Sequence, residues 1–226
     1  EVGYMWTHML RTVKHVLDNI GTEFPEYAGR DHEIAGFGWH QGWNDRTEKG
    51  VAEYEANLVD LIKDVRAQFG KDLPFVIANT GIGGAEVKGV GLDLINAQNA
   101  VADFKKYPGH KGNVAVVDTR PMYRDKSVSP SGFGYHWNHN GITHYEIGAG
   151  MSKAYLQLVG KSSDKKAARA AARYYGIPIR GRRIVFCFDV SASMWGPPIE
   201  AAIADRHDLV QRHLEHARHG RQSPAA

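Results

Sequence analysis

Residues 34–45 read Ile-Ala-Gly-Phe-Gly-Trp-His-Gln-Gly-Trp-Asn-Asp, and this stretch decides the fold of the chain. Its first half is apolar and rich in small residues, which is typical of a buried strand. Its second half gathers aromatic, imidazole, amide and carboxylate side chains directly after that strand, a mixture that ordinary surface turns do not collect. The sequence therefore predicts a buried strand over residues 34–40 that ends in a functional loop.

Helices and further strands alternate around this stretch. Apolar residues at three- and four-residue spacing predict helices over residues 4–20, 50–69, 92–104 and 144–159, and continuous apolar runs predict strands over residues 74–80 and 114–118. Such alternation indicates the α/β class, with a parallel sheet and right-handed crossovers. Because ligand sites in these sheets lie outside the carboxyl ends of the strands, we expect the loops at residues 40–45, 80–84 and 118–120 to share one edge.

A second candidate loop lies just before the last of these helices, at residues 131–141. It places His136 between Tyr135 and Trp137 in a glycine-rich segment. A histidine whose orientation is fixed by aromatic packing is suited to act as a general base. The alternative is an aromatic loop whose histidine only hydrogen-bonds a backbone carbonyl.

Composition restricts the class of protein. The chain has 226 residues, 42% of them apolar, so it can build a sizeable core, and no run is long enough to cross a membrane. The first residues lack the features of a signal peptide, which leaves the localisation open. The single cysteine, Cys187, lies in an apolar run and is expected to be a buried, inert thiol.

Charge divides the chain near residue 160. Residues 1–160 hold 16 Lys and Arg against 19 Asp and Glu, whereas residues 161–226 hold 12 against 6. The basic part has no aromatic interleaving and no nucleic-acid motif, so nucleic acid is not an expected partner.

Four motifs over residues 1–160 resemble the sialate O-acetylesterase-like carbohydrate esterases of the SGNH-hydrolase superfamily. They are Trp-His-Gln-Gly at residues 39–42 with Asp45, Pro-Phe-Val-Ile-Ala at 74–78, Val-Asp-Thr-Arg at 117–120, and Tyr-His-Trp-Asn at 135–138 followed by Ile147-Gly148 and Met151. The resemblance implies a three-layer, flavodoxin-like fold and hydrolysis of acyl esters, commonly acetyl groups, on sugars. It implies an acylated carbohydrate as the partner and no cofactor, and members of the family are often exported.

The resemblance also assigns roles to individual residues. His136 matches the catalytic histidine, and Gln41 and Gly42 match positions that donate hydrogen bonds to the tetrahedral intermediate. The residues expected to bind substrate are Trp39, His40, Asn44, Asp45, Tyr135 and Trp137. Two alternatives remain: Gln41 satisfies the backbone of its own loop, and Trp39 and His40 serve packing.

The sequence departs from the family at two places. The aspartate that usually precedes the catalytic histidine by three residues is replaced by Phe133, so a backbone carbonyl, Asp118 or Asp125 is left to orient His136. The family's first block, an apolar strand ending in Gly-Gln-Ser-Asn, is not among these 226 residues. We therefore expect a sheet that is incomplete at the N-terminus and no nucleophile at its usual place, which leaves open whether the chain is active or an inactive fragment.

The basic part has its own pattern. We expect a linker and helix over residues 161–182, the helix running from Lys161 to Tyr175, a strand over 183–188, a helix over 197–216 and a disordered tail over 219–226. Residues 183–218 resemble the opening of a von Willebrand factor A domain. That resemblance implies a magnesium site formed by the aspartate and serines of an Asp-x-Ser-x-Ser loop, here Asp189, Ser191 and Ser193.

Two hypotheses follow for the whole chain. If the strand at residues 183–188 fills the vacant position in the sheet, Ser191 or Ser193 would emerge near Gln41 and His136 and supply the nucleophile. Alternatively, the chain is a noncatalytic module that binds carbohydrate through its aromatic edge, or a partner protein through magnesium.

Overall fold

The computed structural model describes residues 3–30, 32–160, 171–174, 177–180 and 184–188. The chain divides into two compact units, Glu1–Asp189 and Val190–Ala226. All the described residues belong to the first unit, and the account below concerns that unit alone.

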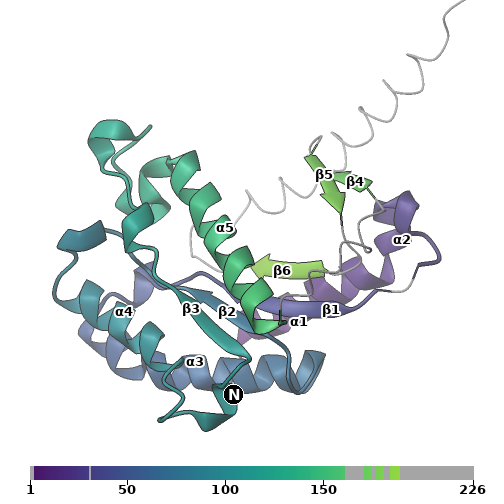
Figure 1. The fold of residues 1–226 in the computed structure, drawn as a ribbon, viewed down its shortest axis with the longest axis horizontal. Helices are drawn as coiled ribbons and strands as arrows, with labels where there is room; N and C mark the ends of the chain where they lie inside the picture. The colour runs from purple at the N-terminus through teal and green to yellow at the C-terminus, as the bar shows by residue number, and fades with distance from the viewer. Residues whose placement is uncertain (1–2, 31, 161–170, 175–176, 181–183, 189–226) are drawn as a thin grey trace, which may run out of the picture. The chain divides into compact units, whose positions relative to one another are not determined.

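A parallel sheet forms the centre of the fold (Figure 1). Its strands are β1 (Ile34–Trp39), β2 (Phe75–Ala78), β3 (Val114–Val117) and β6 (Ile184–Phe188), in the order β3-β2-β1-β6. Each neighbouring pair is parallel. The carboxyl ends of all four strands therefore lie at the same edge of the sheet.

Five α-helices accompany the sheet in the described part of the chain: α1 (Tyr4–Asp18), α2 (Ile20–Glu23), α3 (Glu48–Phe69), α4 (Val90–Ala100) and α5 (Gly141–Leu158). Side-chain caps fix where two of them begin. Thr47 accepts a hydrogen bond from the backbone N–H of Gly50 at the start of α3, and Asn140 accepts one from Thr143 at the start of α5. None of the helices described is long and apolar enough to cross a membrane.

The side chains of β2 alternate between two apolar clusters, which makes three layers. Phe75 and Ile77 pack with residues of α1, α3 and α4, whereas Val76 and Ala78 pack with residues of α5. In Figure 1, α5 lies across one face of the sheet and α3 lies on the other. The α/β class and the three-layer arrangement predicted from the sequence are confirmed.

The small residues of β1 allow α5 to approach the sheet closely. A Cβ atom at Gly36 would lie 2.8 Å from the ring of Tyr155, and the Tyr155 hydroxyl donates a hydrogen bond to the carbonyl of Ala35 at 3.1 Å. Gly36 thus makes room for an aromatic ring.

One predicted element is wrong. The helix expected from Lys161 to Tyr175 is replaced over Ala171–Tyr174 by strand β4, which pairs antiparallel with β5 (Ile177–Arg180). Helix propensity differs by less than about 1 kcal/mol per residue among ordinary residues, so pairing with a neighbouring strand overrides it. Also, the helix expected to reach Phe104 ends at Ala100.

The strand predicted over residues 183–188 is present as β6, and it lies beside β1. Several other predictions fall on residues that the structure does not describe. These are the serine and magnesium-site residues Asp189, Ser191 and Ser193, the helix over 197–216, and the tail over 219–226.

Candidate functional site

The turn that follows β1 requires glycine at position 42. Gly42 has φ +154°, in the region that favours glycine. A Cβ atom at Gly42 would collide with the hydroxyl of Thr80 and lie 2.9 Å from Nε2 of Gln98. No acceptor for the Gly42 N–H lies within the part of the chain that the structure describes. The turn thus buries a glycine whose donor group is not used by its neighbours.

The carbonyl oxygen of Gln41 anchors this turn to three elements. It accepts hydrogen bonds from the hydroxyl of Thr80 at 3.1 Å and from Nε2 of Gln98 at 2.8 Å. The Tyr54 hydroxyl lies 3.0 Å from the same carbonyl oxygen. Gln98 is fully buried, and its Oε1 accepts a hydrogen bond from the backbone N–H of Thr80 at 2.7 Å. The backbone at residues 41–42 is therefore held by groups from α3, α4 and the loop after β2.

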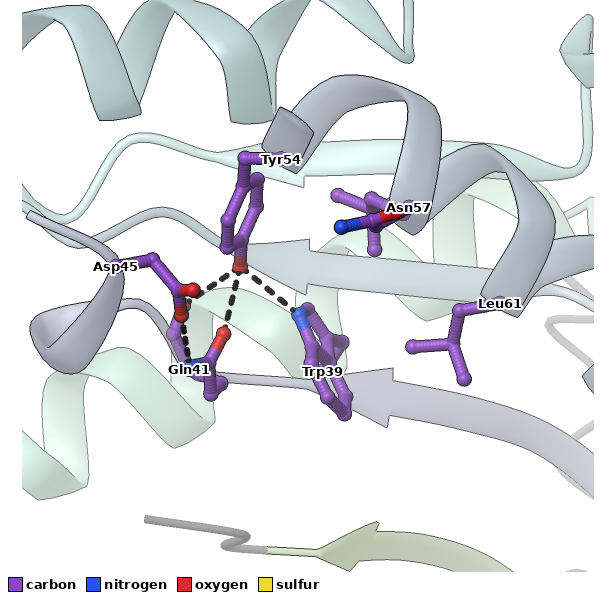
Figure 2. Close-up of a pocket in the computed structure, with 7 residues that line it drawn as sticks. Trp39, Gln41, Asp45, Tyr54, Asn57 and Leu61 are labelled. Atoms are coloured by element: carbon purple, nitrogen blue, oxygen red, sulfur yellow. Dashed lines mark hydrogen bonds between the residues drawn. The ribbon is translucent and has the colours of Figure 1, made fainter. Parts of the chain in front are cut away.

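The side chain of Gln41 is also engaged, as Figure 2 shows. Its Nε2 donates to a carboxylate oxygen of Asp45 at 2.6 Å, and its Oε1 lies 3.0 Å from the Tyr54 hydroxyl. Trp39 donates its indole N–H to the same hydroxyl at 3.2 Å. Burial raises the pKa of Tyr54 to about 12, so the hydroxyl remains protonated at neutral pH.

A cavity of about 230 Å³ opens next to these side chains (Figure 2). Its wall combines aromatic and aliphatic groups with an amide, a carboxylate and a phenol: Trp39, Gln41, Asp45, Tyr54, Asn57, Leu58 and Leu61. Three of the residues predicted for the site, Trp39, Gln41 and Asp45, thus share one cavity.

The second candidate loop carries unusual backbone conformations. Trp137, Asn138 and His139 all have positive φ angles, of 53°, 54° and 56°. Each such residue costs about 1–2 kcal/mol, so the surrounding structure must hold the loop in place. Asn138 does so from the core: it is 2% exposed, and its Nδ2 donates to the carbonyl of Arg124 at 2.9 Å. Strain of this kind is concentrated at functional sites.

Two ring contacts join this loop to the turn after β1. The ring of His40 lies 5.7 Å from that of Trp137, and the ring of Trp43 lies 5.9 Å from that of Tyr135. In the sequence, Gln41 and Gly42 stand between His40 and Trp43, and His136 stands between Tyr135 and Trp137. The two loops singled out from the sequence are therefore neighbours in space.

Residues 4–157 match the family described as carbohydrate esterase, sialic acid-specific acetylesterase. The chain belongs to this family of carbohydrate esterases. The match includes both loops of the candidate site. Comparisons with curated proteins and with solved structures gave no match.

The imidazole of His136 is held by other rings. It lies 4.6 Å from the ring of Tyr135 and stacks at 5.1 Å on that of His139. Both carboxylates considered as its orienting group have other partners. Asp118 binds the guanidinium of Arg120, at 2.7 Å for the closest pair of atoms, which lowers the pKa of Asp118, and Asp125 accepts from the backbone N–H of Ser127.

The remaining predicted residues differ in exposure. Asn44 and Tyr135 are exposed, and His40 is half-buried, with its Nδ1–H donating to the carbonyl of Ala78 at 3.2 Å. Trp137 is only 4% exposed and belongs to the apolar cluster under α5, so little of its ring surface can reach a substrate.

Several residues of the candidate site were not predicted from the sequence. Tyr54 lies within the helix predicted over residues 50–69 and was not expected at the site, whereas Thr80 was expected only as part of the loop 80–84 at the edge of the sheet. Gln98 follows Leu94 by one turn on the buried face of α4, and a polar residue at such a position is the signal that could have found it. The contact between Ser131 Oγ and His139 Nδ1, at 2.8 Å, had no signal in the sequence.

No cluster of three or more His, Cys, Asp or Glu side chains that could hold a metal ion occurs in the described segments. The predicted Asp189, Ser191 and Ser193 are outside those segments.

Proposed function

We propose that this carbohydrate esterase removes acetyl groups from sugars, with O-acetylated sialic acid as the first substrate to examine, by serine-type acyl transfer. The observation that carries the proposal is the pair of ring contacts, His40 to Trp137 and Trp43 to Tyr135, that bring the loop of His136 to the turn of Gln41 and Gly42. Acyl transfer needs oxyanion donors at the carbonyl oxygen and a base within reach of the nucleophile that attacks the carbonyl carbon.

The oxyanion donors in this proposal are Gly42 and Gln41. The Gly42 N–H has no acceptor among the residues described, and its turn is rigidly held, so it can donate to a developing oxyanion without reorganisation. The side-chain amide of Gln41 has two N–H groups, of which one donates to Asp45. An aligned donor of this kind contributes about 3 kcal/mol to transition-state stabilisation.

His136 acts as the general base. It accepts the proton of the attacking hydroxyl, and it returns that proton to the oxygen of the leaving sugar when the tetrahedral intermediate collapses to an acyl-enzyme. Water then attacks the acyl-enzyme with His136 again accepting a proton, the bond between the acetyl carbon and the nucleophile oxygen breaks, and His136 returns the proton to that oxygen as acetate leaves. Packing between Tyr135 and His139 supports the orientation of the imidazole that a carboxylate provides in many esterases.

For the nucleophile, Ser191 and Ser193 are the first candidates. They follow the last residue of β6 by three and five positions, and β6 runs parallel to β1. Ser131 is a second candidate because its Oγ lies 2.8 Å from His139, whose ring stacks on His136.

Hydrolysis of p-nitrophenyl acetate by the full chain tests the proposal. We expect His136→Ala to lower kcat/KM by at least about 100-fold, the usual effect of removing a general base. His144→Ala is the matched control, since His144 is an exposed histidine of α5. Turnover that survives in His136→Ala at the level of His144→Ala would show that His136 is not the base.

The serine variants Ser131→Ala, Ser191→Ala, Ser193→Ala and the double variant of the last two identify the nucleophile in the same assay. A covalent acetyl group found by mass spectrometry on one of these serines provides the second measurement. Full activity in all four variants would place the nucleophile at another residue.

A noncatalytic carbohydrate-binding function is the second candidate, because three aromatic rings beside the site are exposed: Trp43 at 38%, Tyr135 at 44% and Phe133 at 52%. Sugar rings stack on such surfaces. Sugar binding without any turnover would favour this function. Thermal stabilisation by Mg²⁺ that is lost in Asp189→Ala would instead favour a magnesium-dependent module built on residues 189, 191 and 193.

A further inference from the structure

A second cavity lies beside the esterase site and carries positive charge. Its volume is about 420 Å³, and it is lined by Trp43, Arg46, Lys88, Val90 and Gly91. It thus combines one aromatic ring, two cations and small apolar groups. No Asp or Glu belongs to this lining.

The position of Arg46 is fixed on two sides. Its guanidinium carbon lies 4.8 Å from the centroid of the Trp43 ring, which is the distance of a cation–π contact. It also rests on Gly91, where a Cβ atom would lie 2.5 Å from Nη2 of Arg46. A stacked guanidinium keeps its N–H edge available for a planar, bidentate acceptor such as a carboxylate.

The two cations have no counter-ion in the described part of the chain. The ion pairs there join other residues, and neither Arg46 nor Lys88 takes part in one. Arg46 is half-buried, and burial lowers its pKa without removing its charge at neutral pH. A partly desolvated cation without a partner favours an anionic ligand.

A row of aromatic rings leads from this cavity to the candidate base. Arg46 stacks on Trp43, Trp43 lies 5.9 Å from Tyr135, and Tyr135 lies 4.6 Å from His136. Trp43 and the exposed ring of Tyr135 therefore connect Arg46 to the imidazole through consecutive contacts. A ligand that stacks on both rings has a cation beside one of them and the imidazole beside the other.

We propose that Arg46 and Lys88 bind the carboxylate of an acidic sugar whose acylated end reaches His136. This inference rests on the proposed esterase function, because it places a ligand relative to the base of that reaction. Arg46 makes the bidentate contact and Lys88 adds a mobile charge at the exposed side of the cavity. Trp43 stacks on the sugar ring. A bare anion therefore lacks the stacking contact, and a neutral sugar lacks the ionic contacts with Arg46 and Lys88.

Binding of unacetylated N-acetylneuraminic acid to the full chain, measured by titration calorimetry, tests the inference without any need for turnover. N-acetylmannosamine is the neutral probe, and inorganic phosphate is the bare anion. We expect the acidic sugar to bind at least tenfold more tightly than either. Its affinity should fall as salt rises from 50 to 500 mM, because the Debye length then shortens from about 14 to about 4 Å.

Four variants separate the contributions. Arg46→Gln is expected to weaken binding of the acidic sugar at least tenfold and Lys88→Gln about threefold, with no change for the neutral sugar. Lys49→Gln is the matched control, because Lys49 is exposed on α3 and lies outside the lining of the cavity. Gly91→Ala keeps both charges but displaces the guanidinium, so it should weaken the acidic sugar as Arg46→Gln does.

The outcomes distinguish this inference from the esterase function. The cationic subsite is overturned if the acidic and the neutral sugar bind with equal affinity. It is also overturned if Arg46→Gln changes the affinity for the acidic sugar no more than Lys49→Gln does. Both results would hold even if p-nitrophenyl acetate is hydrolysed. Selective, Arg46-dependent binding in a protein whose hydrolysis is insensitive to His136→Ala supports the subsite and rejects the catalytic role of His136. Phosphate that binds as tightly as the acidic sugar would show a general anion site and also overturn the proposal.

Discussion

The ring of Trp43 lies 5.9 Å from the ring of Tyr135, although the two residues are 92 positions apart in the sequence. Trp43 belongs to the turn after β1, and Tyr135 precedes the candidate base His136. Their contact lies at the exposed side of the candidate site, while the contact of His40 with the buried Trp137 lies at the side of the core. The candidate site is thus assembled from two loops whose backbones are fixed by different parts of the core.

The Trp43–Tyr135 contact should be measurable as an energetic coupling. In a double-mutant cycle with Trp43→Ala and Tyr135→Ala, we expect a coupling of about 0.5–1 kcal/mol in the free energy of unfolding, the range of an aromatic pair. Urea unfolding of the four proteins provides the values. A cycle of Trp43→Ala with Tyr145→Ala, an exposed tyrosine on α5, should be additive. Additivity in both cycles would contradict the contact.

Gly42→Ala should destabilise the protein by about 2–4 kcal/mol, since overpacking and an unfavourable φ angle act together. The new Cβ atom would meet the hydroxyl of Thr80 and the amide of Gln98, neither of which can move without losing its hydrogen bonds. Gly148→Ala is the control, because that glycine lies on the exposed face of α5 with no atom within 4 Å of its Cβ position. The control should gain about 0.5–1 kcal/mol from helix propensity. Similar urea midpoints for both variants would contradict the close packing at Gly42.

Gln98→Leu should uncouple the turn after β1 from α4. The substitution nearly preserves volume but leaves the buried N–H of Thr80 without its acceptor and removes one donor to the Gln41 carbonyl. We expect a loss of about 2–4 kcal/mol in the free energy of unfolding, because unsatisfied buried groups cost about 1–3 kcal/mol each.

In the same variant, kcat for p-nitrophenyl acetate should fall more than KM rises if the turn of Gln41 and Gly42 acts as proposed, since Gln98 is buried and bonds the backbone of that turn. Gln157→Leu, at an exposed position of α5, should leave both parameters and the stability unchanged. A Gln98→Leu variant as stable as Gln157→Leu would show that the hydrogen bonds of Gln98 do not hold the turn.

The sheet and its helices were predictable because their sequences carry the patterns of buried strands and amphipathic helices. Residues 34–39, 75–78 and 114–117 are short apolar runs, and Glu48–Phe69 has a single apolar stripe with a threonine cap. The failure at Ala171–Tyr174 has the opposite cause. Its alanines favour a helix in isolation, and only the pairing with Ile177–Arg180, which is a tertiary property, makes it a strand.

The site was predictable in its residue types but not in its connections. The Trp-His-Gln-Gly turn and the Tyr-His-Trp loop were recognisable as motifs. The ties of Gln41 to Tyr54 and Gln98, which lie 13 and 57 positions away, depend on how α3 and α4 pack on the sheet. The left-handed backbone at Trp137–His139 is likewise imposed by the core contacts of Asn138, and no propensity of these residues predicts it.

Tyr54 should make the protein sensitive to alkali within a defined interval. Its pKa is about 12 in the folded protein because burial disfavours the phenolate, against an ordinary value of about 10 in the unfolded chain. A raised pKa means that the contribution of Tyr54 to stability is complete below pH 10 and is lost as the pH rises to 12. Two pKa units correspond to about 3 kcal/mol over the whole titration, of which about 2 kcal/mol falls between pH 10 and pH 12. The free energy of unfolding of the wild type should therefore fall by about 2 kcal/mol more than that of Tyr54→Phe between these pH values. Tyr145→Phe, at a position that is 77% exposed, should follow the wild type.

Urea unfolding at pH 9, 10, 11 and 12 measures the difference. Parallel curves of unfolding free energy against pH for wild type and Tyr54→Phe would mean that the Tyr54 hydroxyl is not buried among Trp39, Gln41 and Gln98.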